Sequence, residues 1–459
     1  MRFSLHLMLA LLAASPAAAE AAVARRPAAA HIAPHPLLRE LAGQVSAGEL
    51  HATIERLVGF GTRHTLSDTT SPTRGIGAAR AWVKSRFESI GRDCGGCLVV
   101  ETPSKTFTGD RLPRPAGIVD VLGVQRGTTD PDRVVVIAGH LDSRVTDAMN
   151  ATDDAPGAND DGSGTAAVLE AARVLSKHRY VATIVYAVLS GEEQGLYGGK
   201  LLAEYARAQK WRVEADLNND IIGNTTGLNG VHDDRHVRIF SEGTRSTETE
   251  AEADRRRYNG GEVDSPSRNL ARYMADLSDD YPSGLQVEMI YRTDRFGRGG
   301  DQVPMLQAGF PAVRVTEAVE NYNRQHQDVR VQDGVHYGDV LGGVDFPYLA
   351  RVTRLNVVTL AALAMAPAPP TGVQISGAVS EDTTLKWSPA PGASRYRVWW
   401  RATTEPRWSH VVDAGGATAK VLNNTTIDDW LFGVSAVSPG GWESPVEFPG
   451  PAGAFTGAH

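Results

Sequence analysis

Apolar runs and amphipathic segments alternate over the first three quarters of the chain. Apolar positions recur at helical spacing in five segments: 37–60, 77–90, 163–176, 196–209 and 340–364. Apolar runs that indicate buried strands occur in four others: 134–138, 182–189, 213–222 and 312–315. Strands that alternate with helices predict an α/β domain with a mixed, mostly parallel sheet flanked by helices.

The pattern changes after a proline-rich linker, residues 366–371 (APAPPT), where a helix cannot continue. Short β-patterned runs then alternate with turns rich in glycine, proline and asparagine: 384–387, 396–400, 420–422 and 430–437. They predict an all-β sandwich domain over residues 372–459, which resembles a fibronectin type III domain. We expect this module to tether the protein to a surface or substrate, or to act as a passive spacer.

The N-terminus has the three parts of a secretory signal. Arg2 supplies a positive charge, residues 5–14 (LHLMLALLAA) form a short apolar core, and the alanines at 17–19 offer a cleavage site. The apolar core is shorter than the ~20 residues that a bilayer span needs. We therefore expect residues 1–19 to be a signal peptide and the protein to be secreted or periplasmic, without a membrane span.

The net charge and the cysteine content of the chain bear on its binding partners and its redox environment rather than on its fold. The chain has a formal net charge of −8, which argues against nucleic acid or an anionic membrane as its main partner. Its two cysteines, Cys94 and Cys97, have the spacing of a redox pair, but no second pair completes a structural zinc site. An exported protein meets an oxidising environment, so a local disulfide is the favoured interpretation.

The candidate chemistry lies in acids and histidines that follow the predicted strands. His140 and Asp142 come just after the run 134–138, and open α/β sheets bind ligands beyond the carboxyl ends of their strands. In extended chain, side chains two residues apart point to the same side, so Asp142 could orient His140 as a metal ligand. Asp160 lies in a glycine-rich loop, 157–164, where a carboxylate could bridge two cations or cap the following helix.

Three further positions follow the same rule. Glu192 and Glu193 come just after the run 182–189 and point in different directions, so one could bind metal while the other acts as a general base. The alternative is a solvated helix start that the helix dipole favours. Asp220 ends a third strand, and His326 lies in a polar loop after the last strand. Such residues at successive strand ends are hard to explain as a solvated surface.

From about residue 37 to residue 365 the motifs resemble the cocatalytic zinc aminopeptidases of peptidase family twenty-eight. The order is the same: His-x-Asp, Gly-Ala-x-Asp, Glu-Glu, Asp before Ile-Gly, and a late histidine. The resemblance implies a zinc peptidase domain over residues 20–365, which would hydrolyse N-terminal residues from peptides. The alternatives are a carboxypeptidase or dipeptidase on the same site, a glutaminyl cyclase with one zinc ion, or a non-catalytic binding protein.

The resemblance also implies a role for each candidate residue. The domain would bind two zinc ions through five ligands. His140 and Asp220 would hold one ion, Glu193 and His326 the other, and Asp160 would bridge the two. Glu192 would be the general base on a zinc-bridging water, and Asp142 would support the first histidine. The family has a tyrosine directly before its last histidine, whereas three residues separate Tyr322 from that position here, so His336 is a rival ligand.

The segment 223–311 is expected to shape the specificity pocket. Tyr291, Phe296 and Met305 are the candidate lining residues, with core packing as the alternative for each. No basic residue can be assigned to a C-terminal carboxylate of the substrate, although three arginines cluster in this segment: Arg292, Arg295 and Arg298.

Overall fold

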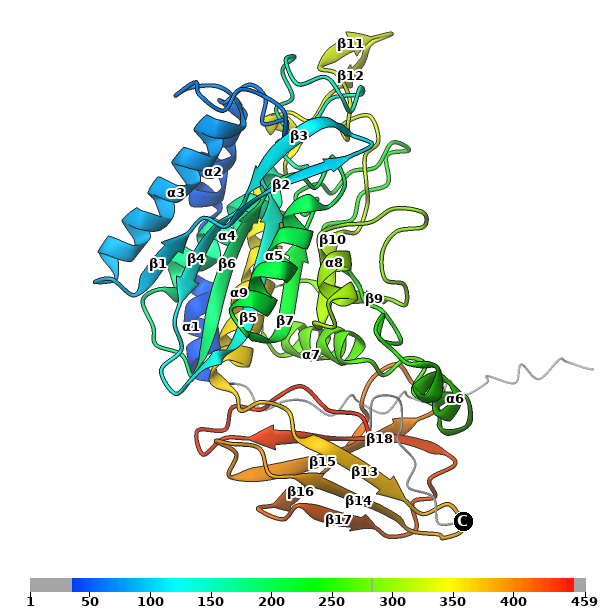
Figure 1. Cartoon of the computed structure of the whole chain (residues 1–459). Helices are drawn as coiled ribbons and strands as arrows, with labels where there is room; N and C mark the ends of the chain where they lie inside the picture. The colour runs from blue at the N-terminus through cyan, green and yellow to red at the C-terminus, as the bar shows by residue number, and fades with distance from the viewer. Residues whose placement is uncertain (1–34, 282–283, 450–459) are drawn as a thin grey trace, which may run out of the picture.

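The computed structural model describes residues 35–281 and 284–449, which form two domains (Figure 1). The expected signal peptide lies outside the described residues. The larger domain has helices on both sides of a sheet, and the smaller one, drawn in orange and red, consists of strands (Figure 1). This is the fold class that the alternation of apolar patterns predicted.

An eight-stranded mixed sheet forms the centre of the larger domain, in the order β1-β4-β6-β5-β7-β10-β8-β9. In that order the strands are Leu98–Glu101, Val121–Gln125, Ala182–Leu189, Asp130–His140, Arg212–Asn219, Ala312–Glu317, His236–Phe240 and Gln286–Ile290. The central strands β6, β5, β7 and β10 run parallel, while β4 pairs antiparallel with β6 and β8 with β10. The carboxyl ends of the four central strands therefore meet at one edge.

Helices cover the two faces of the sheet. One face carries α1 Pro36–Gln44, α2 Ala47–Val58, α3 Gly75–Asp93, α4 Gly162–Leu175, α7 Pro266–Asp280 and α9 Phe346–Met365. The other face carries α5 Tyr197–Ala208 and α8 Gln302–Gln307. Side chains of β5 alternate between the faces, so Val135 and Ile137 pack into the first core while Val134 and Val136 pack into the second.

Two of the predicted helices differ from the structure by more than a few residues at their ends. The segment 37–60 forms two helices because Val45 is extended and the Ser46 hydroxyl caps the second helix by accepting from the Glu49 amide at 3.2 Å. The last helix begins at Phe346 and not at residue 340. The carboxylate of Asp345 caps it, and a short 3₁₀ turn, η1 Leu341–Gly343, precedes it.

Among the described residues, α9 is the one helix long and apolar enough to cross a membrane. In its most apolar window, 83% of the residues are buried inside the protein, where the helix packs against α1, α4 and α7. It therefore serves as the central helix of the larger hydrophobic core.

The smaller domain consists of two three-stranded antiparallel sheets, ordered β13-β14-β17 and β16-β15-β18. The first sheet comprises Thr371–Ser376, Thr383–Ser388 and Ala419–Leu422, and the second His410–Gly415, Arg395–Ala402 and Trp430–Val437. Apolar residues such as Leu385, Val398 and Val434 are buried in one cluster between the sheets. The similarity to fibronectin type III domains stays a prediction.

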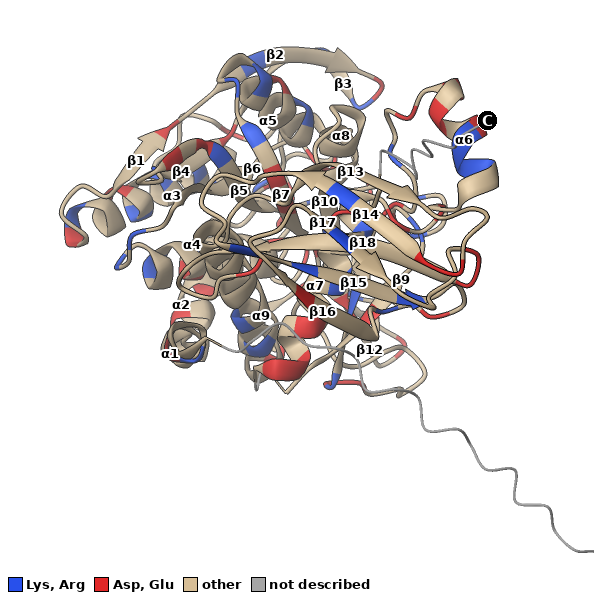
Figure 2. Cartoon of the chain, turned by 90° about the horizontal axis from the view of Figure 1, so that it is seen from below, with Lys and Arg blue, Asp and Glu red and all other residues tan. Residues whose placement is uncertain are grey.

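A buried ionic contact joins the two domains in addition to the linker. Figure 2 shows the chain from below, with the strands of the smaller domain in front of the larger domain. Asp264, just before α7, accepts hydrogen bonds from Arg272 of α7 at 3.0 Å and from Arg401 of β15 at 2.7 Å. All three side chains are almost completely buried. An ion pair at this depth is costly to break, so it fixes the sandwich against the larger domain.

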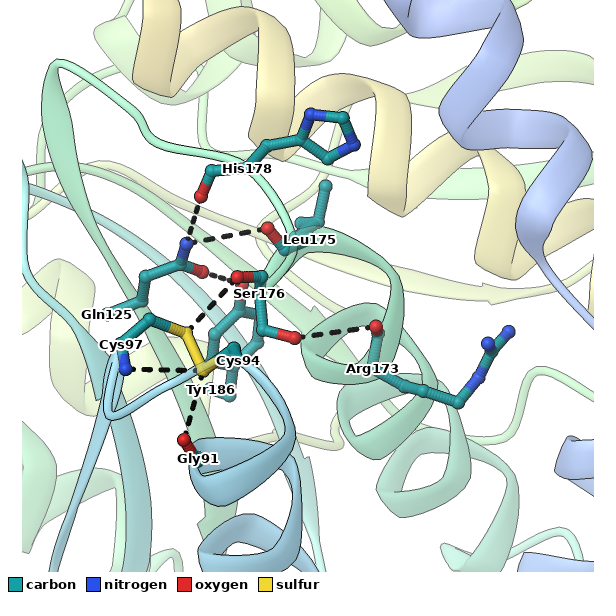
Figure 3. The surroundings of a disulfide bond; sticks show 9 residues. All are labelled: Gly91, Cys94, Cys97, Gln125, Arg173, Leu175, Ser176, His178 and Tyr186. Carbon is teal, nitrogen blue, oxygen red and sulfur yellow. Dashed lines mark hydrogen bonds between the residues drawn. A yellow bond between two sulfur atoms is a disulfide. The ribbon is translucent and has the colours of Figure 1, made fainter.

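Cys94 and Cys97 form a disulfide just after α3 (Figure 3). The amide of Cys97 also donates a hydrogen bond to the sulfur of Cys94 at 3.2 Å, which closes the turn. The disulfide lies beside Ser176, at the carboxyl end of α4. The loop that carries Asp160 leads into the opposite, amino end of that helix.

Candidate metal centre and cleft

The candidate ligands gather at the carboxyl edge of the parallel strands. His140 ends β5, the two glutamates follow β6, and Asp220 follows β7. Asp160 comes from the loop between β5 and α4, and His326 from the loop after β10. The parallel strands place His140, the two glutamates and Asp220 at one edge of the sheet, and the longer loops after β5 and β10 bring Asp160 and His326 to the same place.

Asp160 lies at the centre of the cluster, between the two histidines. Its Oδ1 is 3.2 Å from His140 Nε2, and its Oδ2 is 3.0 Å from His326 Nε2. Glu193 Oε1 is also 3.0 Å from His326 Nε2, and Asp220 Oδ1 is 4.0 Å from His140 Nε2. Both histidines thus contact Asp160. Each also faces one further carboxylate, which is Asp220 for His140 and Glu193 for His326.

This donor set suits divalent metal ions. Two groups of potential ligand atoms each lie within 4.8 Å of one another: His140, Glu192 and Asp220, and Asp160, Glu193 and His326. Glu193 Oε1 is buried and faces His326 Nε2, itself a candidate ligand, so a cation between the two atoms would satisfy both. Imidazole nitrogens with carboxylate oxygens are a ligand set that zinc accepts.

Two arginines hold the outer oxygens of the flanking carboxylates. Arg144 Nε donates to Glu193 Oε2 at 2.8 Å, and Arg144 Nη2 lies 2.6 Å from His326 Nδ1. Arg314, fully buried on β10, donates to Asp220 Oδ2 at 2.5 Å. Because each carboxylate gives one oxygen to an arginine, its other oxygen is left facing a histidine. Neither arginine was predicted from the sequence, although Arg314 is a charged residue inside the apolar run 312–315.

Asp142 supports the site in a way that differs in detail from the expectation. Its backbone carbonyl accepts from His140 Nδ1 at 3.0 Å, while its carboxylate oxygen is farther away, at 3.7 Å. The carboxylate instead accepts from Gly191 N at 2.8 Å, Glu193 N at 3.1 Å and Thr65 Oγ1 at 2.9 Å. The side chain therefore fixes the turn that carries the two glutamates, because β5 ends at His140 and the chain is no longer extended.

The two adjacent aspartates of the glycine-rich loop have separate tasks. Asp161 caps α4 by accepting from Gly164 N at 2.8 Å, and it also accepts from His140 N at 2.9 Å. Asp160 is thus left to face the histidines. Its own amide donates to Asp339 Oδ2 at 2.7 Å, a contact that sequence analysis did not anticipate.

Glu192 lies at the floor of the cleft and is only partly exposed. Burial raises the pKa of its carboxyl group well above the usual range, and the charges of Asp220 and Glu193 raise it further. No side-chain hydrogen bond of Glu192 is seen in the described residues. A carboxyl group with a raised pKa that faces a cleft is suited to accept and return a proton.

The cleft has a volume of about 840 Å³, and three expected lining residues are not among those that form its wall. Met305 is completely buried in the core between α8 and the sheet. Tyr291 lies 3.7 Å beneath the guanidinium of Arg268, and Phe296 is 87% exposed. These corrections have one cause: a sequence shows that a residue is apolar but not which way its side chain faces. His336, the rival ligand, is exposed on the hairpin of β11 Arg330–Gln332 and β12 Val335–Tyr337.

Known proteins resemble this chain in sequence and in fold. The sequence pattern described as "Peptidase family M28" matches residues 120–333. A "Probable zinc metalloprotease" of Pyrenophora teres f. teres is 44% identical over 425 residues, covering 91% of this chain and 88% of that protein. Another of Leptosphaeria maculans is 44% identical over 423 residues, covering 91% and 98%.

Solved structures share the fold of the larger domain. LapB from Legionella pneumophila has a TM-score of 0.53 at 19% identity, over 72% of this chain and 77% of that one. The Legionella pneumophila LapA aminopeptidase has a TM-score of 0.51 at 19% identity, over 72% and 75%. The fold, the cluster of acids and histidines and these sequence relatives define a zinc metallopeptidase. The chain belongs to peptidase family M28, and peptides are its substrates.

Proposed function

We propose that the protein is an exported aminopeptidase that uses two zinc ions to release N-terminal residues from peptides. The observation that carries this proposal is the position of Asp160, which turns one carboxylate oxygen toward each histidine. His140 and Asp220 would hold one ion, and Glu193 and His326 the other. A single zinc ion, as in the cyclase alternative, would leave one of these buried ligand groups without a cation.

The zinc pair, when bound, supplies Lewis acidity that polarises the scissile carbonyl and makes water a better nucleophile. Glu192 is the one acid among the candidate ligands and base that is partly exposed to the cleft, and with Asp160 between the two ions it would remain free to act as a base. It takes the proton of the attacking water and delivers it to the leaving nitrogen. Asp142 keeps Glu192 in place, because its carboxylate binds the amides on both sides of that residue.

The proposal that the protein is exported is based on the signal pattern of residues 1–19. A tethering role for the C-terminal module is proposed from its sandwich form. Amino-terminal sequencing of protein recovered from the medium or periplasm tests the first, with a new N-terminus expected at Glu20. A full-length precursor found inside the cell would contradict it.

Replacing Glu192 by Gln tests the mechanism. The variant should keep both zinc ions but lose about 10²- to 10⁴-fold in kcat on leucine p-nitroanilide, the range that general acid–base groups contribute. Glu88→Gln is the matched control, because Glu88 is exposed on α3 and should leave kcat unchanged. Equal activity of the Glu192→Gln variant and the wild type, including none in both, would reject the aminopeptidase proposal.

A further inference from the structure

The wall of the cleft is cationic once the metal ligands and Glu192 are set aside. Five basic side chains line it: Arg111, Arg144, Lys200, Arg295 and Arg298. Asp110 is the single acid among the remaining described lining residues, and the larger apolar side chains are limited to Leu196, Tyr197 and Tyr322. A wall of this composition offers little apolar surface to a hydrophobic substrate side chain.

On one side, the charges of the basic residues are only partly balanced. Glu320 receives Arg298 at 2.7 Å and Arg238 at 2.8 Å, and it lies 3.7 Å from Arg295. Asp294 pairs with Arg295 at 3.1 Å. Arg295 also lies 3.9 Å from Asp220, and Arg314 pairs with Asp220 and with Asp294. Four guanidinium groups thus face three carboxylates, so this network keeps a positive charge.

On the other side, two exposed cations have no acidic partner in the described residues. Arg111 Nη1 donates to the backbone oxygen of Glu193 at 2.8 Å, and Lys200 Nζ donates to that of Gly195 at 2.9 Å. Both carbonyls belong to the turn that carries the candidate base and a candidate ligand. Each cation keeps further N–H donors, which remain available to an anion in the cleft.

The two cations are held in place by packing. Arg111 sits at the tip of the hairpin β2 Ser104–Gly109 and β3 Leu112–Val119, which lies against α5, the helix that carries Lys200 (Figure 1). A buried cluster joins the two elements: Leu112, Ile118, Tyr197 and Leu201. The approach is so close that a Cβ at Gly109 would lie 1.9 Å from the Tyr197 hydroxyl. The packing of the hairpin on α5 therefore sets the distance between Arg111 and residues 191–195, the turn that carries Glu192 and Glu193.

We propose that the cleft selects peptides that carry a carboxylate beside the scissile bond, and that Arg111 and Lys200 bind this carboxylate. The proposal rests on the peptidase function proposed above and names its substrate class. The carboxylate can come from an acidic side chain or from a free C-terminus one residue beyond the scissile bond. Both sources present the same pair of acceptor oxygens to the two cations.

Three dipeptides separate the two sources when they are given to the zinc-loaded full chain. Leu-Gln-amide has no carboxylate, Leu-Glu-amide has one on its side chain, and Leu-Gln has one at its terminus. We expect kcat/KM to be at least about tenfold higher for one or both acidic peptides, as for a charge-assisted hydrogen bond. Calorimetric binding to the Glu192→Gln variant should show the same order, and the preference should weaken with added salt.

A double variant, Arg111→Gln with Lys200→Gln, assigns the preference to these residues. It should hydrolyse the three peptides with equal kcat/KM, whatever the absolute rate, while its unfolding temperature stays close to that of the wild type. Lys84→Gln, an exposed change on α3, is the matched control and should keep the preference.

Equal turnover and equal binding of the three peptides by the wild type would overturn the inference, and so would a preference that survives in the double variant. A different result would refute the aminopeptidase proposal alone. No peptide would then be hydrolysed, but the Glu192→Gln variant would still bind the acidic peptides more tightly, and the inference would stand.

Discussion

Replacement of Arg314 by Met tests the view that this buried arginine holds a zinc ligand in place. Arg314 Nη1 is 2.5 Å from Asp220 Oδ2, and its Nη2 is 3.3 Å from the backbone oxygen of the same residue. Methionine fills much of the same volume but donates no hydrogen bond. Asp220 Oδ2 would then lose its hydrogen-bond donor and keep only Arg295, at 3.9 Å, as a neighbouring cation. Asp294, 3.7 Å from Arg314, would lose a neighbouring positive charge as well.

The size of the effect follows from this burial. Removing one member of a buried ion pair costs about 3–5 kcal/mol, a large share of the roughly 5–15 kcal/mol that typically stabilises a domain. Asp220 would also be free to turn its Oδ1 away from His140, and loss of such a supporting partner lowers metal affinity about 10- to 100-fold. Bound zinc compensates part of the exposed charge, so the loss of stability should be smaller with zinc than without it.

The assay combines urea unfolding, with and without zinc, and titration of zinc against a coloured chelator. Arg314→Lys should be intermediate, because lysine keeps the charge but not the forked donors. Arg133→Met is the matched control. Arg133 is buried on β5 and pairs with Glu214 at 2.7 Å, far from the metal centre, so its loss should lower stability but not zinc affinity. Equal zinc affinities for the Arg314 and Arg133 variants would refute the reasoning.

Three further outcomes are expected. Asp160→Asn, which removes the shared charge between the histidines, should reduce bound zinc from two ions per chain to one or none in elemental analysis; two tightly held ions would contradict the bridging role. Burial raises the pKa of Glu447 to about 7, so its ionisation opposes folding and stability should fall as pH rises from the usual glutamate range toward 7. Glu447→Gln should flatten this fall in urea midpoints measured at pH 5 and pH 8, and an unchanged slope would show that another group is responsible. Replacing Cys94 and Cys97 by Ser should cost about 2 kcal/mol, because the closed loop is short, and should leave kcat unchanged; a large loss of kcat would link the disulfide to the site.

The order of the motifs was a good guide to which acids and histidines lie together, because it depends on local rules. An apolar run marks a buried strand, and the residue just beyond its carboxyl end must lie at one edge of a parallel sheet. His140, Glu193 and Asp220 follow this rule directly. The pocket residues were a different problem. Met305 and Tyr291 are apolar enough for either a core or a cleft. The packing of α8 buries Met305 in the core, whereas Tyr291 stacks on Arg268 and stays 43% exposed.

The sequence by itself determined the α/β class, the change to a β-sandwich after the linker, and the set of residues that can bind metal, because each depends on near neighbours in the chain. The tertiary structure decided which charges support that set. Arg314 reaches Asp220 across 94 residues, and Arg144 reaches His326 across 182. The tertiary structure also placed Arg111 beside the turn that carries Glu192 and Glu193, because the hairpin of β2 and β3 packs on α5. Contacts over such separations arise when strands and loops are brought together in space, and no local pattern of hydrophobic and polar residues records them.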